Sequence, residues 1–299
     1  MSEIEHEVFF HETRSLCSPK PLFHSFIILL TNSRLFLSIF ALTTFPLSLL
    51  LFVLFLYSAP LKAQIYNLEA LAAFTSTPFE ARHVSEESRS DSLILLRVKF
   101  LFFLPSYALS ILATIASVNS TVLACSGKRP NFQTAFAAVQ AIWKRPLVTS
   151  VYVFGIMLPL EHVLRTLSAM IAGGTPMRWV VAAAGAALEV YVKAVLSLAM
   201  VVSVVEERSG WDAVKMGWWV VEEKRFCWWV LAGFLGLVSG GVWRGLSVVI
   251  DDQDWMMEVG LICLCGFVIL WSYVVITVYY FGCSNRTRHV DAVDDGPTI

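Results

Sequence analysis

The chain has 299 residues, of which 57% are apolar and only 15% are charged, and its formal net charge is −1. Soluble domains carry about a quarter charged residues, so the composition and the mean hydropathy of +0.68 exclude an ordinary soluble protein. The near-neutral charge also argues against the basic surface that nucleic-acid binding requires. These values predict an integral membrane protein.

The first 34 residues are predicted to form a cytosolic tail that ends in a short interfacial helix. Residues 1–20 contain four glutamates and lack the basic stretch that opens a secretory signal peptide. After them, apolar side chains recur at helical spacing, at Leu22, Phe23, Phe26, Ile27 and Leu30. We expect these residues to lie in the membrane interface and the first span to be retained as an anchor.

Six apolar stretches are long enough to cross a bilayer, which takes about 20 residues per helix. They are residues 35–57, 98–123, 146–172, 178–205, 226–250 and 259–282. Residues 75–92 are expected to form a solvated loop, and residues 283–299 a disordered cytosolic tail. We therefore predict an all-α membrane protein with a six-helix transmembrane domain over residues 35–282.

Two short amphipathic segments, about residues 131–145 and 210–224, connect consecutive spans. Apolar residues at helical spacing mark the first, at Phe132, Ala135, Val139 and Ile142. The second repeats that spacing at Trp211, Val214, Trp218 and Val221. Neither segment is long enough to span, so both are predicted to be interfacial helices, with Trp143, Trp211 and Trp218 as anchors. The chain is thus interpreted as a duplicated unit of span, interfacial helix and span.

The distribution of Lys and Arg predicts the orientation. A basic pair stands at the C-terminal end of each interfacial segment, whereas the connection after the fifth span holds Asp251, Asp252, Asp254 and Glu258 and no basic residue. Cytosolic loops carry the excess of basic residues. We expect both termini in the cytosol and the protein in the endomembrane system or the plasma membrane.

Charged residues inside the spans are the candidate functional residues. Glu189 and Lys193 stand four residues apart in the fourth span, and Glu161 and Arg165 repeat this spacing in the third, with His162 between them. Such residues are costly in lipid and usually serve a pathway or an internal pair. Two interpretations stay open: a polar track along both spans, or neutralised pairs that hold helices together. We expect Glu189 and Lys193 to face the bundle interior.

Motifs for catalysis or metal binding are missing from the sequence. It has no HExxH, GxSxG or phosphate-loop pattern, and its six cysteines do not have zinc-ligand spacing. We expect no catalytic residue, no cofactor and no metal site. Glycines at small-x3-small spacing in the fifth span (Gly236, Gly240, Gly241 and Gly245) favour close packing within the bundle, with a dimer interface as the alternative.

Three short motifs carry a resemblance to a known family. They are residues 201–207 with Gly210 and Ala213, residues 45–48, and residues 278–280 with Cys283. From about residue 18 to 285 the chain resembles a plant-typical family of uncharacterised six-span membrane proteins. That family is distantly similar to the membrane domain of some glycerophosphodiester phosphodiesterases, whose catalytic domain has no counterpart here. The resemblance implies the architecture and no established activity.

Two classes of function remain. The first is a non-enzymatic membrane component that organises lipid or partner proteins through its cytosolic interfacial helices. Its partners would be the bilayer and a membrane protein or a second copy of the chain. The alternative is a small-solute or ion transporter that uses the charged residues of the third and fourth spans. Against transport, the duplication links spans in parallel, and paired half-helices around a midplane site are not evident.

Overall fold

The computed structural model describes residues 20–74, 78–128, 132–170, 176–206, 208–223, 225–252 and 255–294. Within these ranges the chain is almost entirely helical and has no strand. Six helices are long and apolar enough to cross a membrane: Ser33–Ile65, Arg89–Cys125, Lys144–Leu164, Ala183–Val205, Cys227–Leu246 and Trp255–Cys283. The predicted all-α membrane fold with six transmembrane helices is confirmed.

The first span combines three helical segments, α3 (Ser33–Ile39), the π-helix η2 (Phe40–Thr44) and α4 (Phe45–Phe74). Four long helices form most of the other spans: α5 (Pro78–Cys125), α7 (Lys144–Met170), α8 (Pro176–Val205) and α10 (Arg225–Asp252). The last span belongs to α11 (Trp255–Asp294). Three short helices lie outside the spans: α2 (Lys20–Thr31), α6 (Phe132–Ile142) and α9 (Trp211–Glu223).

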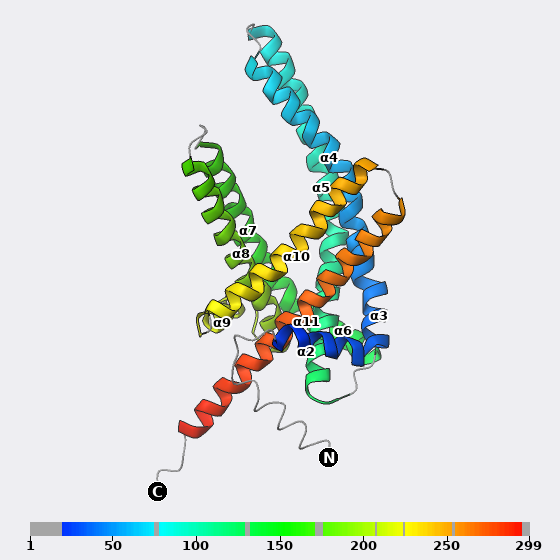
Figure 1. Ribbon diagram of the computed structural model, residues 1–299, viewed down its shortest axis with the longest axis vertical. Coiled ribbons are helices and arrows are strands. Elements are labelled where there is room, and N and C mark those ends of the chain that lie inside the picture. Colours follow the sequence, from blue (N-terminus) through cyan, green and yellow to red (C-terminus); the bar gives the residue numbers. More distant parts are fainter. Residues whose placement is uncertain are drawn as a thin grey trace.

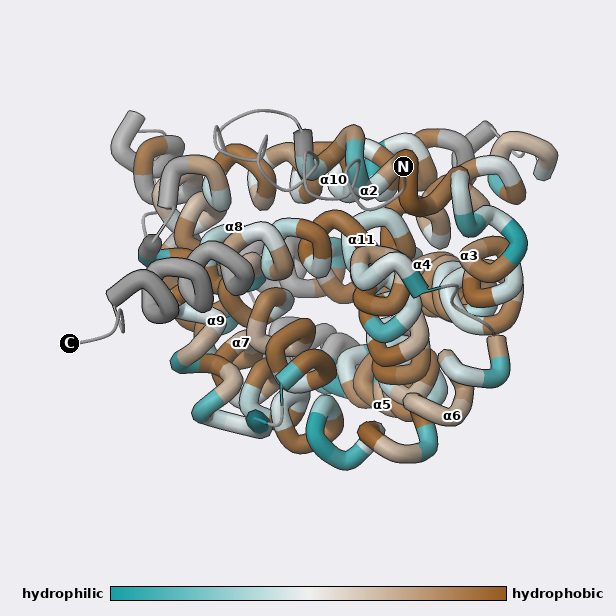
Figure 2. Tube along the Cα trace, turned by 90° about the horizontal axis from the view of Figure 1, so that it is seen from below, coloured by the Kyte–Doolittle hydropathy of each residue, from teal (hydrophilic) through white to brown (hydrophobic). Residues whose placement is uncertain are grey.

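The spans form three hairpins, α4/α5, α7/α8 and α10/α11, which are joined at one end (Figure 1). The short helices α2, α6 and α9 gather there, and we call this the core end. Away from it the α4/α5 and α7/α8 hairpins diverge (Figure 1). Figure 2, which looks at the core end, shows hydrophobic residues along most of the helices and hydrophilic ones mainly at turns. Many of the large apolar side chains are exposed. An apolar outer surface is what a lipid-embedded bundle requires.

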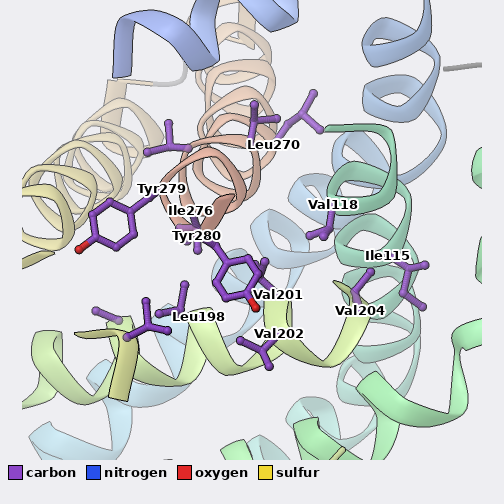
Figure 3. Close-up of a cluster of buried hydrophobic side chains, with 14 of the residues drawn as sticks. Ile115, Val118, Leu198, Val201, Val202, Val204, Leu270, Ile276, Tyr279 and Tyr280 are labelled. Carbon is purple, nitrogen blue, oxygen red and sulfur yellow. The ribbon is translucent and has the colours of Figure 1, made fainter. Parts of the chain in front are cut away.

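The hydrophobic core lies where α5, α8 and α11 cross at the core end. Its fully buried side chains come from all three helices (Figure 3): Ile115, Val118, Leu198, Val201, Val202, Leu270, Tyr279 and Tyr280. By contrast, only 11% of the α7 span and 17% of the α10 span are buried. The largest buried cluster therefore lies at the core end, and smaller ones lie where α10 and α11 pack on each other and on α4.

The π-helix η2 has a local cause in the sequence. Pro46 lacks the N–H that would continue the α-helical ladder, and the preceding N–H, that of Phe45, donates to Phe40 O five residues back. Hydroxyls satisfy carbonyls in the same region, since Thr43 Oγ1 donates to Ile39 O at 2.7 Å. On the α11 side a Cβ added at Gly266 would lie 3.2 Å from the Thr44 carbonyl oxygen. The π-helix is thus packed closely against α11.

Two stretches expected to be irregular are helical. The prediction of a solvated loop over residues 75–92 is wrong from Pro78 onward, because α5 begins there. The prediction of a disordered tail from residue 283 is wrong as far as Asp294, where α11 ends, and residues 295–299 lie outside the described ranges. Adding residues to an existing helix needs no new nucleus. Pro also suits the first helical position, and Gly296 and Pro297 follow the end of α11.

The glycines of α10 do not pack inside the bundle as predicted. A Cβ added at Gly236, Gly240 or Gly241 would meet no described atom within 4 Å. At Gly245 it would meet Leu261 of α11 at 3.6 Å, which is ordinary contact. The packing prediction is wrong for the first three positions because these glycines lie on the exposed side of α10, whereas Val242 and Leu246 on the same helix are buried. The dimer interface stays a prediction.

Candidate functional site at the core end

α9 folds back along the last turns of α8 as a close helical hairpin. A Cβ added at Gly217 would lie 3.1 Å from the Ala199 amide nitrogen and 3.2 Å from the Val195 carbonyl oxygen. The backbones of the two helices therefore approach each other with no room for a side chain. Around this contact, Ala213, Val214 and Val221 are buried.

The turn between α8 and α9 is built around Gly210. Its φ of +64° lies in the left-handed region that favours glycine. Its N–H donates to Thr149 Oγ1 of α7 at 3.0 Å, and an added Cβ would lie 3.0 Å from the Tyr152 ring. The third span thus holds the turn that starts α9. The connection between α5 and α6 also contains a glycine with positive φ, Gly127.

Glu206 joins the end of α8 to α11. The buried hydroxyl of Tyr280 donates a hydrogen bond to Glu206 Oε1, and Arg208 Nε lies 3.3 Å from Glu206 Oε2. A hydrogen bond to a charged group is stronger than one between neutral groups. Sequence reasoning missed the role of Glu206, and its signal is an acidic residue at the end of a span, two residues before an arginine.

The apolar stripes of the duplicated helices divide into an inner and an outer half. The inner residues Ala135 and Val139 of α6 and Val214 and Val221 of α9 are buried. The outer residues are exposed, namely Phe132, Phe136, Trp143, Trp211, Trp218 and Trp219. Each helix therefore packs against the bundle on one side and presents aromatic side chains on the other.

Of the three predicted anchors, Trp218 has ring contacts with the protein. Its ring meets Tyr191 of α8 edge-on, with the centroids 5.8 Å apart. Tyr191 in turn stacks on Trp229 of α10 at 5.3 Å. This cluster of Tyr191, Trp218 and Trp229 connects α8, α9 and α10 through amphipathic rings that suit a membrane interface.

The ion pair in the fourth span forms, but the bundle does not enclose it. Lys193 Nζ lies 2.5 Å from Glu189 Oε1, while their side chains are 53% and 33% exposed. The expectation that both face the interior is wrong, because α8 is covered mainly beyond this point, from Ala194 to Val204. On α7, Glu161 is half-buried and His162 exposed. The Arg165 side chain lies outside the part of the chain that the structure describes.

Substitution of the two charges tests whether they act as one unit. A lone charge in lipid costs about 2.5–3.5 kcal/mol on insertion scales. Glu189→Gln or Lys193→Met alone should therefore lower the yield of folded protein in bilayers, and the double substitution should restore it, since no orphan charge remains. The yield is measured as the monodisperse fraction after reconstitution. Losses that simply add in the double variant would show that the pair is not coupled.

The described residues contain no group of three or more His, Cys, Asp and Glu side chains that could hold a metal ion. No curated protein and no solved structure matches the chain. Residues 11–295, which include all six spans and all three short helices, match a family described as Domain of unknown function (DUF8558). The chain belongs to this family, DUF8558.

Proposed function

We propose that the protein is a non-enzymatic membrane component that organises lipid or partner proteins at the cytosolic face through the exposed sides of α6 and α9. The observation that carries this proposal is the division of both helices into a buried inner half and an aromatic outer half. Helices with this pattern lie in the interface plane with their apolar side in the headgroup boundary. α2 adds a third such surface, with Phe23 and Leu30 exposed.

The core end also has the charge pattern of a cytosolic face. The exposed basic side chains Arg34, Lys128, Lys144, Arg208 and Lys215 lie on or beside its short helices. Glu258 begins the last span at the opposite end. The bias of basic residues toward the cytosol then supports cytosolic termini in an endomembrane or plasma membrane. The resemblance to a plant-typical family, and more distantly to the membrane domain of some glycerophosphodiester phosphodiesterases, concerns the six-span architecture and leaves the activity open.

Transport of a small solute or ion is the second candidate. The partly exposed Glu189–Lys193 pair on α8 favours it, with Glu161 on the neighbouring helix. Ionisable groups within spans often line a pathway. The double variant of Glu189 and Lys193 tests this candidate. If it folds normally but no longer supports the cellular phenotype of the wild-type protein, transport is favoured over the first proposal.

Glycosylation mapping tests the orientation. Acceptor sites introduced near residue 76 and near residue 253 should be modified, since both connections would lie in the lumen or outside the cell. The native sequons at Asn119 and Asn285 should remain unmodified, because both would lie on the cytosolic side. The measurement is the shift in electrophoretic mobility that a glycosidase reverses. A glycan on Asn285 of the wild-type protein would contradict the orientation.

Spin-label accessibility tests the depth of α9. A nitroxide attached at position 211 or 218 in a cysteine-free background should collide more with oxygen, which concentrates in lipid, than with a water-soluble nickel chelate. We expect shallow immersion at both positions, because the helix lies at the boundary and does not cross it. A label at Asp212, on the polar side of the same helix, is the matched control and should favour the nickel chelate. Labels at 211 and 218 that behave like the control would contradict the interfacial placement.

A further inference from the structure

A groove opens on the surface between the first span and α6. It has a volume of about 330 Å³ and is lined by Ser38, Ala41, Leu42 and Phe132. Small-molecule sites start at about 300 Å³, so the groove is large enough for part of a lipid chain. Its lining is apolar apart from Ser38, whose hydroxyl already donates to the Arg34 carbonyl oxygen at 2.9 Å.

The walls of this groove are held in place by packing behind them. Ala41 and Leu42 belong to the π-helix η2, a type of segment that is frequent at functional sites. On its other side η2 is in close contact with Gly266 of α11. The opposite wall is Phe132 of α6, whose inner residues Ala135 and Val139 are buried in the bundle. The groove is therefore formed by packed helices.

Among the described residues of α2, α3, η2 and α6, all formal charges are positive. Arg34 lies one helical turn before Ser38 on the same face, and Lys128 lies four residues before Phe132; both are exposed. No acidic residue occurs from residue 13 to 68 or from 92 to 160, which covers α2, α3, η2 and α6. His24 of α2 adds little charge at neutral pH, since burial lowers its pKa. The second of the duplicated helices, α9, differs from α6 in charge, because Asp212 and Glu222 stand among its basic residues.

We propose that this groove binds one acyl chain of an anionic glycerophospholipid, with Arg34 and Lys128 holding its phosphate-bearing headgroup. An apolar slot beside cationic side chains at the end of a span matches a molecule with a hydrocarbon chain and an anionic head. The inference rests on the proposed function, which places α6 in the membrane interface, and it adds a lipid class and a site. The occupant is a lipid of the leaflet in contact with the core end.

Photocrosslinking tests the site in the 299-residue chain reconstituted into nanodiscs. The probes are phosphatidylserine and phosphatidylcholine, each with a diazirine in one acyl chain. We expect phosphatidylserine to label peptides that contain residues 38–42 and Phe132, and to do so more strongly than phosphatidylcholine. Ala41→Trp should abolish this labelling by filling the groove. Leu37→Trp is the matched control, since Leu37 is exposed on the preceding helix α3 and does not line the groove.

Removal of the basic groups tests the headgroup contact separately. Arg34→Gln and Lys128→Gln should each lower the preference for phosphatidylserine by about fivefold, the effect of one basic residue near an anionic surface. Lys215→Gln on the α9 copy should leave the preference unchanged. Equal labelling by both lipids, or labelling of Ala41→Trp at the wild-type level, would overturn the proposal. Failure of the glycosylation test would instead overturn the proposed function. The two failures can be distinguished, because lipid labelling at the groove does not depend on which leaflet surrounds it.

Discussion

Gly217→Val is expected to abolish the recovery of folded protein. A Cβ at this position would press on the backbone of α8, on the Ala199 nitrogen and the Val195 carbonyl oxygen, and neither can move without displacing the helix. Overpacking in a well-packed core costs about 1–3 kcal/mol and occasionally more. The valine methyl groups extend beyond the Cβ, so we expect the upper part of this range. Recovery is measured as the monodisperse peak of a fluorescent fusion in detergent, together with its thermal unfolding midpoint.

Gly236→Val is the matched control for this experiment. The substitution has the same chemistry and the same cost in helix propensity, but no described atom lies within 4 Å of the added Cβ on α10. The control should retain nearly the wild-type yield. Equal losses in the two variants would mean that helix propensity, and not the contact between α8 and α9, determines the outcome. A loss of dimers in Gly236→Val with normal folding would support the predicted dimer interface.

Glu206→Gln and Tyr280→Phe should each destabilise the core end, and the double variant should be no worse than the more damaging single change. The two side chains share one hydrogen bond at the edge of the buried cluster. A hydrogen bond to a charged group contributes about 1.5–3 kcal/mol, and groups in direct contact show coupling of about 0.5–3 kcal/mol in a double-mutant cycle. The measurement is the unfolding midpoint of the purified protein in detergent.

Tyr57→Phe is the control for the loss of a tyrosine hydroxyl. Tyr57 is exposed on α4, so its hydroxyl has little influence on packing and the variant should unfold like the wild type. Additive effects of Glu206→Gln and Tyr280→Phe would contradict the coupling. They would leave Arg208 as the main partner of Glu206 at the end of α8.

Local patterns in the sequence predicted much of the fold. Apolar length identified the six spans, because a helix must satisfy its own backbone in lipid. The i, i+4 spacing of Glu189 and Lys193 predicted their ion pair, since four residues return to the same face of a helix. The length of a span and this ion pair each depend on residues within one helix. A single stretch of sequence is therefore enough to predict them.

Contacts between helices were not predictable in the same way. Glu206 and Tyr280 meet across 74 positions of the chain, and Gly217 differs from Gly236 only in what lies opposite it. The spacing of small residues indicates that a close approach is possible but not whether a neighbouring helix is there. The exposure of Lys193 has the same origin, because it depends on how far α8 leans away from the other hairpins. A single sequence contains no direct signal for the angles between the helical hairpins.

The concentration of side-chain packing at one end has a mechanical consequence. The α7/α8 hairpin is a lever fixed at its base, and α7 with 27 residues is an arm of about 40 Å. Rotation of such an arm by about 5° moves its tip by about 4 Å. When the arm is inclined, part of this movement changes its height across the bilayer, and tilting is how spans adapt to membranes of different thickness. Few contacts with the other hairpins oppose this motion, because the free ends of the α4/α5 and α7/α8 hairpins diverge (Figure 1). Thinning or thickening of the bilayer can therefore be absorbed by the inclination of the arms, while the geometry at their common base stays the same.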